Sequence, residues 1–297
     1  AFLQSSSIVL LMTLSFVGAG VISLRNALAV VLGANLGTTL DSWLVAWLGF
    51  SVHAENLAIP LLIIALAGLL LPARFRMLRH WTVVIISLAF ILLSLTMMKS
   101  AMNAHETESL VRYFAAWPPY VFIAVGFILT GIIQSSFAMM VVLFSAVHGN
   151  VITLEHAAAA VVGSEVGTAV KFFFGTTKAS ADKLRFAWGN FLFNVLTVII
   201  GCIFLYPLIG FIRNFLFPND PVKSLAFFQF SLNLIVLVIC FPVLGSLAHW
   251  LEKRFKEVKG SRSSRTDASI VPVSSLEQLH GEVRSLFLSA KIGRAHV

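Results

Sequence analysis

Residues 2–11 read FLQSSSIVLL, which sets four polar side chains, Gln4, Ser5, Ser6 and Ser7, inside an apolar run. A hydroxyl or amide group in hydrocarbon costs free energy unless it finds a hydrogen-bond partner. Four such groups in a row predict either small polar contacts between packed helices or a polar site within a membrane protein. One copy of the stretch does not separate these two interpretations.

The composition of the chain indicates a lipid bilayer as its solvent. Of 297 residues, 58% are hydrophobic and 11% are charged, whereas a soluble domain carries about 25% charged residues. A transmembrane helix needs about 20 apolar residues. Five runs reach or approach that length: residues 57–71, 81–98, 118–133, 186–209 and 225–250. The sequence therefore predicts an all-α polytopic membrane protein.

The opening stretch is repeated later in the chain. QSS returns at Gln134, Ser135 and Ser136, 130 residues after Gln4, Ser5 and Ser6. Each copy is followed at the same distance by a glycine-bracketed motif, GANLGTT at residues 33–39 and GSEVGTA at residues 163–169. Two copies at one offset indicate a duplicated unit, and they favour a shared polar site over incidental helix contacts.

The positions of the basic residues predict how the two copies are oriented. Loop 72–80 and the tail after residue 250 are rich in Lys and Arg, so both are expected in the cytoplasm. Residues 175–185 are also basic, but the equivalent stretch after the first copy, residues 45–55, holds no Lys or Arg and is expected outside. The two halves are therefore predicted to have inverted topology in the membrane. The net charge of +8 follows this pattern, so no nucleic-acid partner is expected.

The duplication also predicts the domain organisation. Residues 1–116 form the first repeat with a connecting helix, residues 117–250 the second repeat, and residues 251–291 a cytoplasmic tail. The chain starts inside a motif and without Met, so we expect residues upstream of it. The last six residues, 292–297, read IGRAHV, as a translated sequencing-library adapter does, and are expected to be non-native.

The two QSS segments have the length of re-entrant hairpin arms. Residues 7–20 and 137–149 hold about 14 residues each, fewer than the roughly 17 to 20 needed to cross a bilayer. At a hairpin tip, free N–H groups, serine hydroxyls and a helix N-terminus together favour an anion. Amide, hydroxyl and carbonyl oxygens suit an alkali cation, and we expect carbonyls to be freed where residues 33–39 and 163–169 break their helices. The pattern is typical of an ion-coupled anion transporter.

Paired QSSS motifs, each followed by a GANIGTT-like segment, resemble the type II sodium/phosphate cotransporter family, including its bacterial members. The likeness covers roughly residues 4–250. It implies that the two QSSS regions line the pathway for phosphate and sodium, with phosphate bound by Ser5, Ser6, Ser7, Ser135 and Ser136. The residues that match the family's motifs and would bind the cation are Gln4, Gln134, Asn35, Thr38, Thr39 and Thr168. This sequence departs from the family at Phe137, in place of the third serine, and at Glu165, in place of the asparagine.

Several polar residues outside the family pattern are weaker candidates. Glu165 is expected to be paired with Lys171, protonated, or a cation ligand, because a carboxylate in a membrane is costly. Asn194 lies four residues after Asn190 and could supply a cation ligand or an interhelical hydrogen bond. Asp41 and Lys171 occupy equivalent positions in the two copies, and an ion pair between them is a further hypothesis.

These observations predict sodium-coupled symport of inorganic phosphate by alternating access, with no enzymatic activity and with sodium as the only metal and no cofactor. The alternatives are a phosphate exporter, or a carrier of another oxyanion or a dicarboxylate. An intramembrane serine enzyme is disfavoured, because the sequence has no G-x-S-x-G or H-E-x-x-H motif. Some bacterial relatives continue into a PhoU-like helical domain, so the tail is expected to carry such regulation or to end in a single surface helix.

Overall fold

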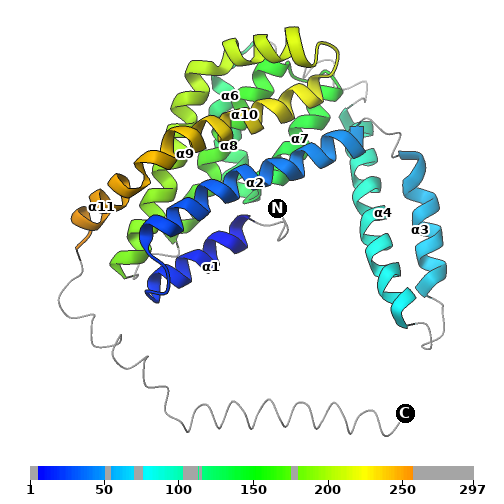
Figure 1. The fold of residues 1–297 in the computed structure, drawn as a ribbon. Coiled ribbons are helices and arrows are strands. Elements are labelled where there is room, and N and C mark those ends of the chain that lie inside the picture. Colours follow the sequence, from blue (N-terminus) through cyan, green and yellow to red (C-terminus); the bar gives the residue numbers. More distant parts are fainter. Residues whose placement is uncertain are drawn as a thin grey trace, which may run out of the picture. The chain divides into compact units, whose positions relative to one another are not determined.

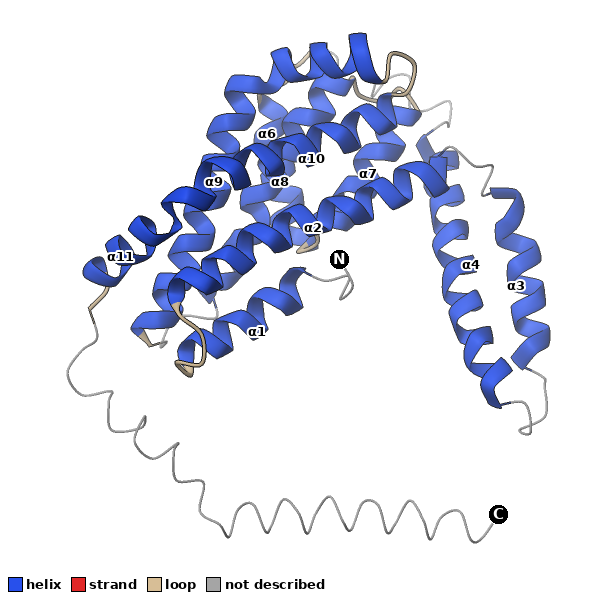
Figure 2. Cartoon of the chain, in the orientation of Figure 1, coloured by secondary structure: helices blue, strands red, loops and turns tan. Residues whose placement is uncertain are grey.

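The computed structural model describes residues 6–50, 55–69, 76–102, 113, 116–174 and 180–256. Every regular element in these ranges is a helix (Figures 1 and 2). The helices are α1 (Ser6–Gly18), α2 (Leu24–Phe50), α3 (Glu55–Leu69), α4 (Arg76–Met102), α6 (Val121–Ile133), α7 (Ser136–His148), α8 (Leu154–Phe174), α9 (Ala181–Phe211), α10 (Pro221–Cys240) and α11 (Leu244–Arg254). The surface helix or PhoU-like domain predicted in the tail lies outside the described residues, which end at residue 256.

Within the described residues, four helical segments are long and apolar enough to cross a membrane: Leu24–Trp47, His80–Ala101, Ala181–Leu216 and Pro221–Arg254. They confirm the prediction of an all-α membrane protein. Two of the expected runs, residues 57–71 and 118–133, hold the shorter apolar helices α3 and α6, with 15 and 13 described residues. At 1.5 Å per residue these helices are about 20 Å long, less than the hydrocarbon thickness of about 30 Å. The span Leu24–Trp47 was not among the predicted spans, because its polar residues lower its mean hydropathy.

The two copies of the motif fold alike locally. Helices α1 and α7 are described over equivalent residues and end at equivalent positions, 130 residues apart. After α1 the N–H of Val21 donates to Phe16 O at 2.9 Å, and after α7 the N–H of Val151 donates to Ala146 O at 2.8 Å. These bonds cap a helix C-terminus and need a left-handed residue, which is Gly20 (φ 71°) in one copy and Asn150 (φ 54°) in the other. The opposite orientation of the two halves in the membrane stays a prediction.

The glycine-bracketed motifs do not break their helices, so the prediction of broken helices is wrong at these two points. Helix α2 continues through residues 33–39, and α8 continues through residues 163–169. The Thr38 hydroxyl donates to Asn35 O at 2.8 Å, and the Thr168 hydroxyl donates to Glu165 O at 3.0 Å. Discontinuities occur instead after α9, in the π-helix Ile212–Leu216, and after α10, in the 3₁₀ segment Phe241–Val243.

The second glycine motif packs α8 against α6. A Cβ atom on Gly163 would overlap the carbonyl oxygen of Ile123, and one on Gly126 would overlap that of Ala160. A Cβ on Gly167 would lie 2.8 Å from Phe127 O. The G-x-x-x-G spacing puts Gly163 and Gly167 on one face of α8, so the two backbones approach directly. The motif that looked like a helix break is therefore a contact surface.

Helix α10 packs against both repeats. It runs beside α2 of the first repeat in Figure 1, and it contacts α7, α8 and α9 of the second. Its buried face combines apolar residues such as Leu225 and Phe228 with the polar residues Gln229 and Asn233. Helices α3 and α4 form a hairpin, and the Lys99 ammonium group of α4 donates to Gly49 O near the end of α2 at 2.6 Å. The interior of the protein thus contains polar side chains of α10, the helix that packs against both repeats.

Candidate functional site

The second QSS copy forms the tip of a helical hairpin. Gln134 and Ser135 are the two residues between α6 and α7. Gln134 adopts a left-handed conformation (φ 58°), its N–H donates to Thr130 O at 2.8 Å, and its side-chain amide donates to Gly131 O. These bonds terminate α6, and the chain reverses direction over the two residues before α7 begins. The two arms have 13 residues each, as a re-entrant hairpin requires.

Ser135 starts the return arm as the N-cap of α7. Its backbone is extended (φ −140°, ψ 111°), and its hydroxyl oxygen accepts a hydrogen bond from the N–H of Ala138 at 3.2 Å. Ser136 is the first helical residue, and Ser135 and Ser136 are both half-buried. The N-terminus of α7 therefore points out of the hairpin tip with two hydroxyl groups beside it, an arrangement that favours an anion.

The first QSS copy is described only in part. Helix α1 starts at Ser6, and the side chains of Ser6 and Ser7 are half-buried. Gln4 and Ser5, predicted as a cation and a phosphate ligand, lie outside the described residues. Helix α1 packs against α2 and α9, whereas α7 packs against α8 and α2, so α2 contacts the helices of both copies.

Glu165 is held between α8 and α10. Its side chain is 7% exposed, and its Oε1 accepts a hydrogen bond from the Asn233 amide nitrogen at 3.2 Å. The Gln229 side chain, one turn earlier on α10, also lies beside this carboxylate. The side chains of Gln229 and Asn233 are both buried. The structure thus brings the predicted ligand Glu165 together with two amides that the sequence reasoning missed, although their Gln-x-x-x-Asn spacing in an apolar run was a readable signal.

The threonine and Asn194 candidates for cation binding bond within their own helices. Asn35 and Thr38 are half-buried, and the buried Thr39 donates its hydroxyl to Leu36 O at 2.7 Å. The Asn194 amide donates to Asn190 O at 2.8 Å, one turn earlier on α9, which is not the interhelical bond expected. The Lys171 side chain lies outside the described residues, and so do its two proposed ion pairs, with Glu165 and with Asp41.

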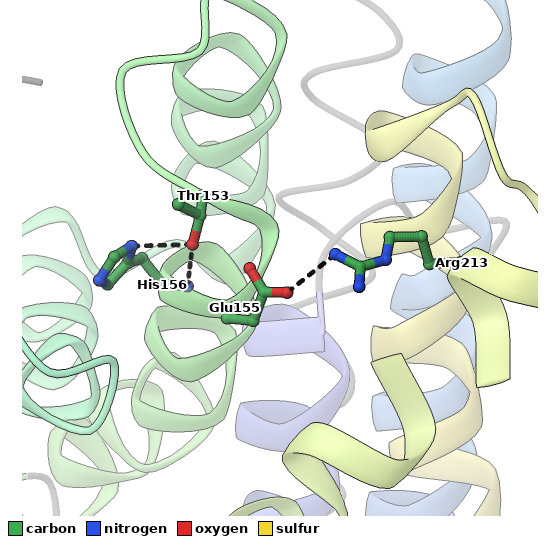
Figure 3. A network of polar contacts seen from close by, with 4 residues as sticks. All are labelled: Thr153, Glu155, His156 and Arg213. Carbon is green, nitrogen blue, oxygen red and sulfur yellow. Dashed lines mark hydrogen bonds and ion pairs between the residues drawn. The ribbon is translucent and has the colours of Figure 1, made fainter. Parts of the chain in front are cut away.

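A polar network anchors the start of α8 (Figure 3). His156 lies 2.9 Å from the Thr153 hydroxyl through Nδ1 and 2.9 Å from Trp117 O through Nε2. Because a carbonyl oxygen only accepts, Nε2 carries the proton. Glu155 forms an ion pair with Arg213 of the π-helical segment at 3.3 Å. These contacts hold the start of α8 to Trp117, just before α6, and to Arg213, just after α9. They therefore position the helix that carries Glu165.

Comparison with known proteins agrees with the motifs. The sequence profile described as Na+/Pi-cotransporter matches residues 1–100 and 101–240. "Uncharacterized protein YqeW" of Bacillus subtilis (strain 168) is 26% identical over 245 residues, which are 81% of this chain and 76% of the relative. "Putative inorganic phosphate export protein YjbB" of Salmonella typhimurium (strain LT2) is 24% identical over 264 residues, which are 86% of this chain and 46% of that protein.

No solved structure matches the chain at a comparable level. The profile covers both halves of the duplication, including both QSS copies and both glycine-bracketed motifs. The chain belongs to the Na+/Pi-cotransporter family.

Proposed function

We propose that this protein is a sodium-driven symporter of inorganic phosphate in the bacterial inner membrane, and that it works by alternating access. Family membership indicates phosphate transport, and we add the sodium coupling and the inward direction. The observation that carries the proposal is the hairpin tip, where Gln134 and Ser135 join two 13-residue helices and start α7. Helix α1 is described from the equivalent residue, Ser6, and the proposal assigns the first QSS copy the same role.

In this proposal phosphate binds between the two QSS copies. The ligands are the hydroxyl groups of Ser5, Ser6, Ser7, Ser135 and Ser136 together with backbone N–H groups at the starts of α1 and α7. Hydrogen bonds to a charged acceptor are roughly twice as strong as bonds between neutral groups, and a helix N-terminus adds positive potential. This set of donors suits an oxyanion and needs no cofactor.

Sodium binds to side-chain oxygens in this proposal. Because α2 and α8 continue through their glycine motifs, their backbone carbonyls stay within the helix and are not the free ligands that a broken helix would offer. The candidate ligands are the oxygens of Gln4, Gln134, Asn35, Thr38, Thr39, Glu165, Thr168 and Asn194. Oxygen ligands of this kind suit a hard cation.

Export is the second candidate, because the Salmonella relative is named as a phosphate export protein. Right-side-out vesicles separate the two directions. With an inward sodium gradient, a symporter accumulates radiolabelled phosphate from outside, whereas an exporter only releases phosphate loaded inside. Accumulation that collapses when sodium is equal on both sides supports the proposal, and release alone supports export.

The proposed inverted topology can be tested with single cysteines. The variants Ser51→Cys and Ala179→Cys place thiols at nearly equivalent points of the two repeats, both outside the described residues. We expect a membrane-impermeant maleimide to label Ser51→Cys from the periplasm and Ala179→Cys only from the cytoplasm, because basic residues flank the second site alone.

The background for this labelling is a chain in which Cys202 and Cys240 are replaced by alanine. Labelling of both introduced thiols from one face would mean a parallel duplication, and the two hairpin tips would then no longer approach the pathway from opposite sides. The cytoplasmic tail and its PhoU-like regulation remain predictions of the sequence.

A further inference from the structure

The contact between α8 and α10 buries a negative charge among neutral groups. Glu165 accepts a hydrogen bond from the Asn233 amide and has the Gln229 amide beside it, and neither amide brings a charge. Among the side chains that the structure describes, this carboxylate has no positive partner. A buried carboxylate of this kind is costly in a membrane protein even when it is hydrogen-bonded, which favours a site that takes up a positive charge.

The charged and titratable residues on the neighbouring helices do not supply that charge. Helix α6 has none, and those of the other helices around Glu165 lie near the helix ends or are thiol and phenol groups. They are His148 on α7, Asp182, Lys183, Arg185, Cys202 and Tyr206 on α9, and Lys223 and Cys240 on α10. On α8 itself, Glu155 is paired with Arg213, His156 bonds to Thr153 and Trp117, and the Lys171 side chain lies outside the described residues.

A second observation at this contact also indicates a missing ligand. The carbonyl oxygen of the Gln229 side chain is fully buried and has no hydrogen-bond partner in the described part of the chain, although this side chain lies beside Glu165. A buried acceptor without a partner costs about 1 to 3 kcal/mol. Because the oxygen and nitrogen of one amide share a carbon atom, this unpaired oxygen lies close to the carboxylate.

We propose that Glu165, Gln229 and Asn233 form a binding site for one positive charge, taken up either as a sodium ion or as a proton. The inference deepens the proposed function and rests on it, because it assigns the coupling ion to the contact between α8 and α10. A sodium ion would be ligated by a Glu165 oxygen and the Gln229 oxygen. A proton would sit on Glu165 and donate to the Gln229 oxygen. In both cases Asn233 holds the second side of the carboxylate through its amide nitrogen.

Sodium binding to the purified full chain in nanodiscs tests the site without any transport step. The probe is radioactive sodium in a scintillation proximity assay at pH 6 and pH 8.5, with choline keeping the ionic strength constant, and the midpoint of thermal unfolding is measured in parallel. The variants are Glu165→Gln and Gln229→Leu. The matched control is Thr130→Val, because the Thr130 hydroxyl is also buried without a partner but lies on α6, against Gly167.

For the wild type we expect sodium to bind more weakly at pH 6, because protons compete for the same carboxylate. Glu165→Gln should weaken sodium binding more than about tenfold and remove its pH dependence, since the amide can neither ionise nor take a proton. Gln229→Leu should weaken binding by about tenfold, the worth of roughly one strong ligand contact, and keep the pH dependence. Thr130→Val should bind as the wild type does.

A site that takes only a proton gives a different supporting result. Sodium would then not bind, but the unfolding midpoint of the wild type would depend on pH, and Glu165→Gln would lose that dependence. Wild-type sodium affinity and wild-type pH dependence in both site variants would overturn the proposal. If Glu165→Gln does not fold, Gln229→Leu still tests the sodium affinity with the carboxylate in place, and an unchanged affinity overturns the sodium site.

Failure of this inference differs from failure of the proposed function. If sodium drives phosphate uptake but Glu165→Gln and Gln229→Leu bind and use sodium normally, the site is wrong and the symport stands. If the site binds sodium as expected but no sodium-driven phosphate uptake occurs, the site stands and the symport is wrong.

Discussion

The Gly163→Ala variant should fail to assemble the pair of helices α6 and α8. A Cβ atom at this position overlaps the carbonyl oxygen of Ile123 and lies 2.7 Å from its carbonyl carbon. These are backbone atoms, so no side-chain rotation relieves the overlap, and the helices must separate. Overpacking of a core costs about 1 to 3 kcal/mol when side chains can yield. Here we expect a loss at or above the top of that range, with a large drop in monodisperse protein and in the unfolding midpoint.

The variant Gly210→Ala is the matched control. Gly210 lies inside α9, and a Cβ atom there meets no described atom within 4 Å. Replacing an interior helical glycine by alanine normally stabilises a helix by about 0.5 to 1 kcal/mol, so this variant should be as stable as the wild type or more so. Gly163→Ala with the same unfolding midpoint as Gly210→Ala would show that α6 and α8 do not pack backbone to backbone.

The Ser5→Ala and Ser135→Ala variants should each raise the phosphate concentration at half-maximal uptake by tenfold or more. Each removes a hydroxyl from the proposed phosphate site, where a hydrogen bond to a charged group is worth about 1.5 to 3 kcal/mol. Ser135 has a structural role as well, because its hydroxyl caps α7, and loss of such a cap costs about 1 kcal/mol.

The variant Ser135→Thr separates the two roles of Ser135, because threonine keeps the hydroxyl and the cap. It should retain both the thermal stability and most of the phosphate affinity, whereas Ser135→Ala loses affinity at saturating sodium. Phosphate half-saturation is measured by uptake into proteoliposomes at equal reconstituted protein. Unchanged half-saturation in both alanine variants would exclude the hairpin tips as the phosphate site.

The sequence predicted the second hairpin arm closely. The expected arm 137–149 differs by one residue at each end from α7, Ser136–His148. The prediction was close because local signals mark both ends of this helix: a serine N-cap at its start and a Gly-Asn turn after it, with the left-handed residue that the turn requires at Asn150. The duplicated turn after α1 follows the same rule. Local chemistry therefore sufficed for this part of the site.

Contacts between helices were not predictable in the same way. Gly163 and Gly167 were interpreted as a helix break, yet the same spacing also builds a close helix contact, and only the position of α6 distinguishes the two. The amides of Gln229 and Asn233 gained a role only when α10 was placed against Glu165. Sequence spacing identifies the face of a helix, but it does not identify the helix that lies opposite.

Phosphate uptake into proteoliposomes tests the central claim most directly. The purified chain is reconstituted, and uptake of radiolabelled phosphate is measured with an inward gradient of sodium, of potassium or of protons as the only driving force. We predict accumulation above the external concentration with the sodium gradient, no accumulation with potassium, and loss of the signal when a sodium ionophore dissipates the gradient. Phosphate uptake that is equal with sodium and potassium, or that occurs with neither, would contradict sodium-coupled phosphate symport.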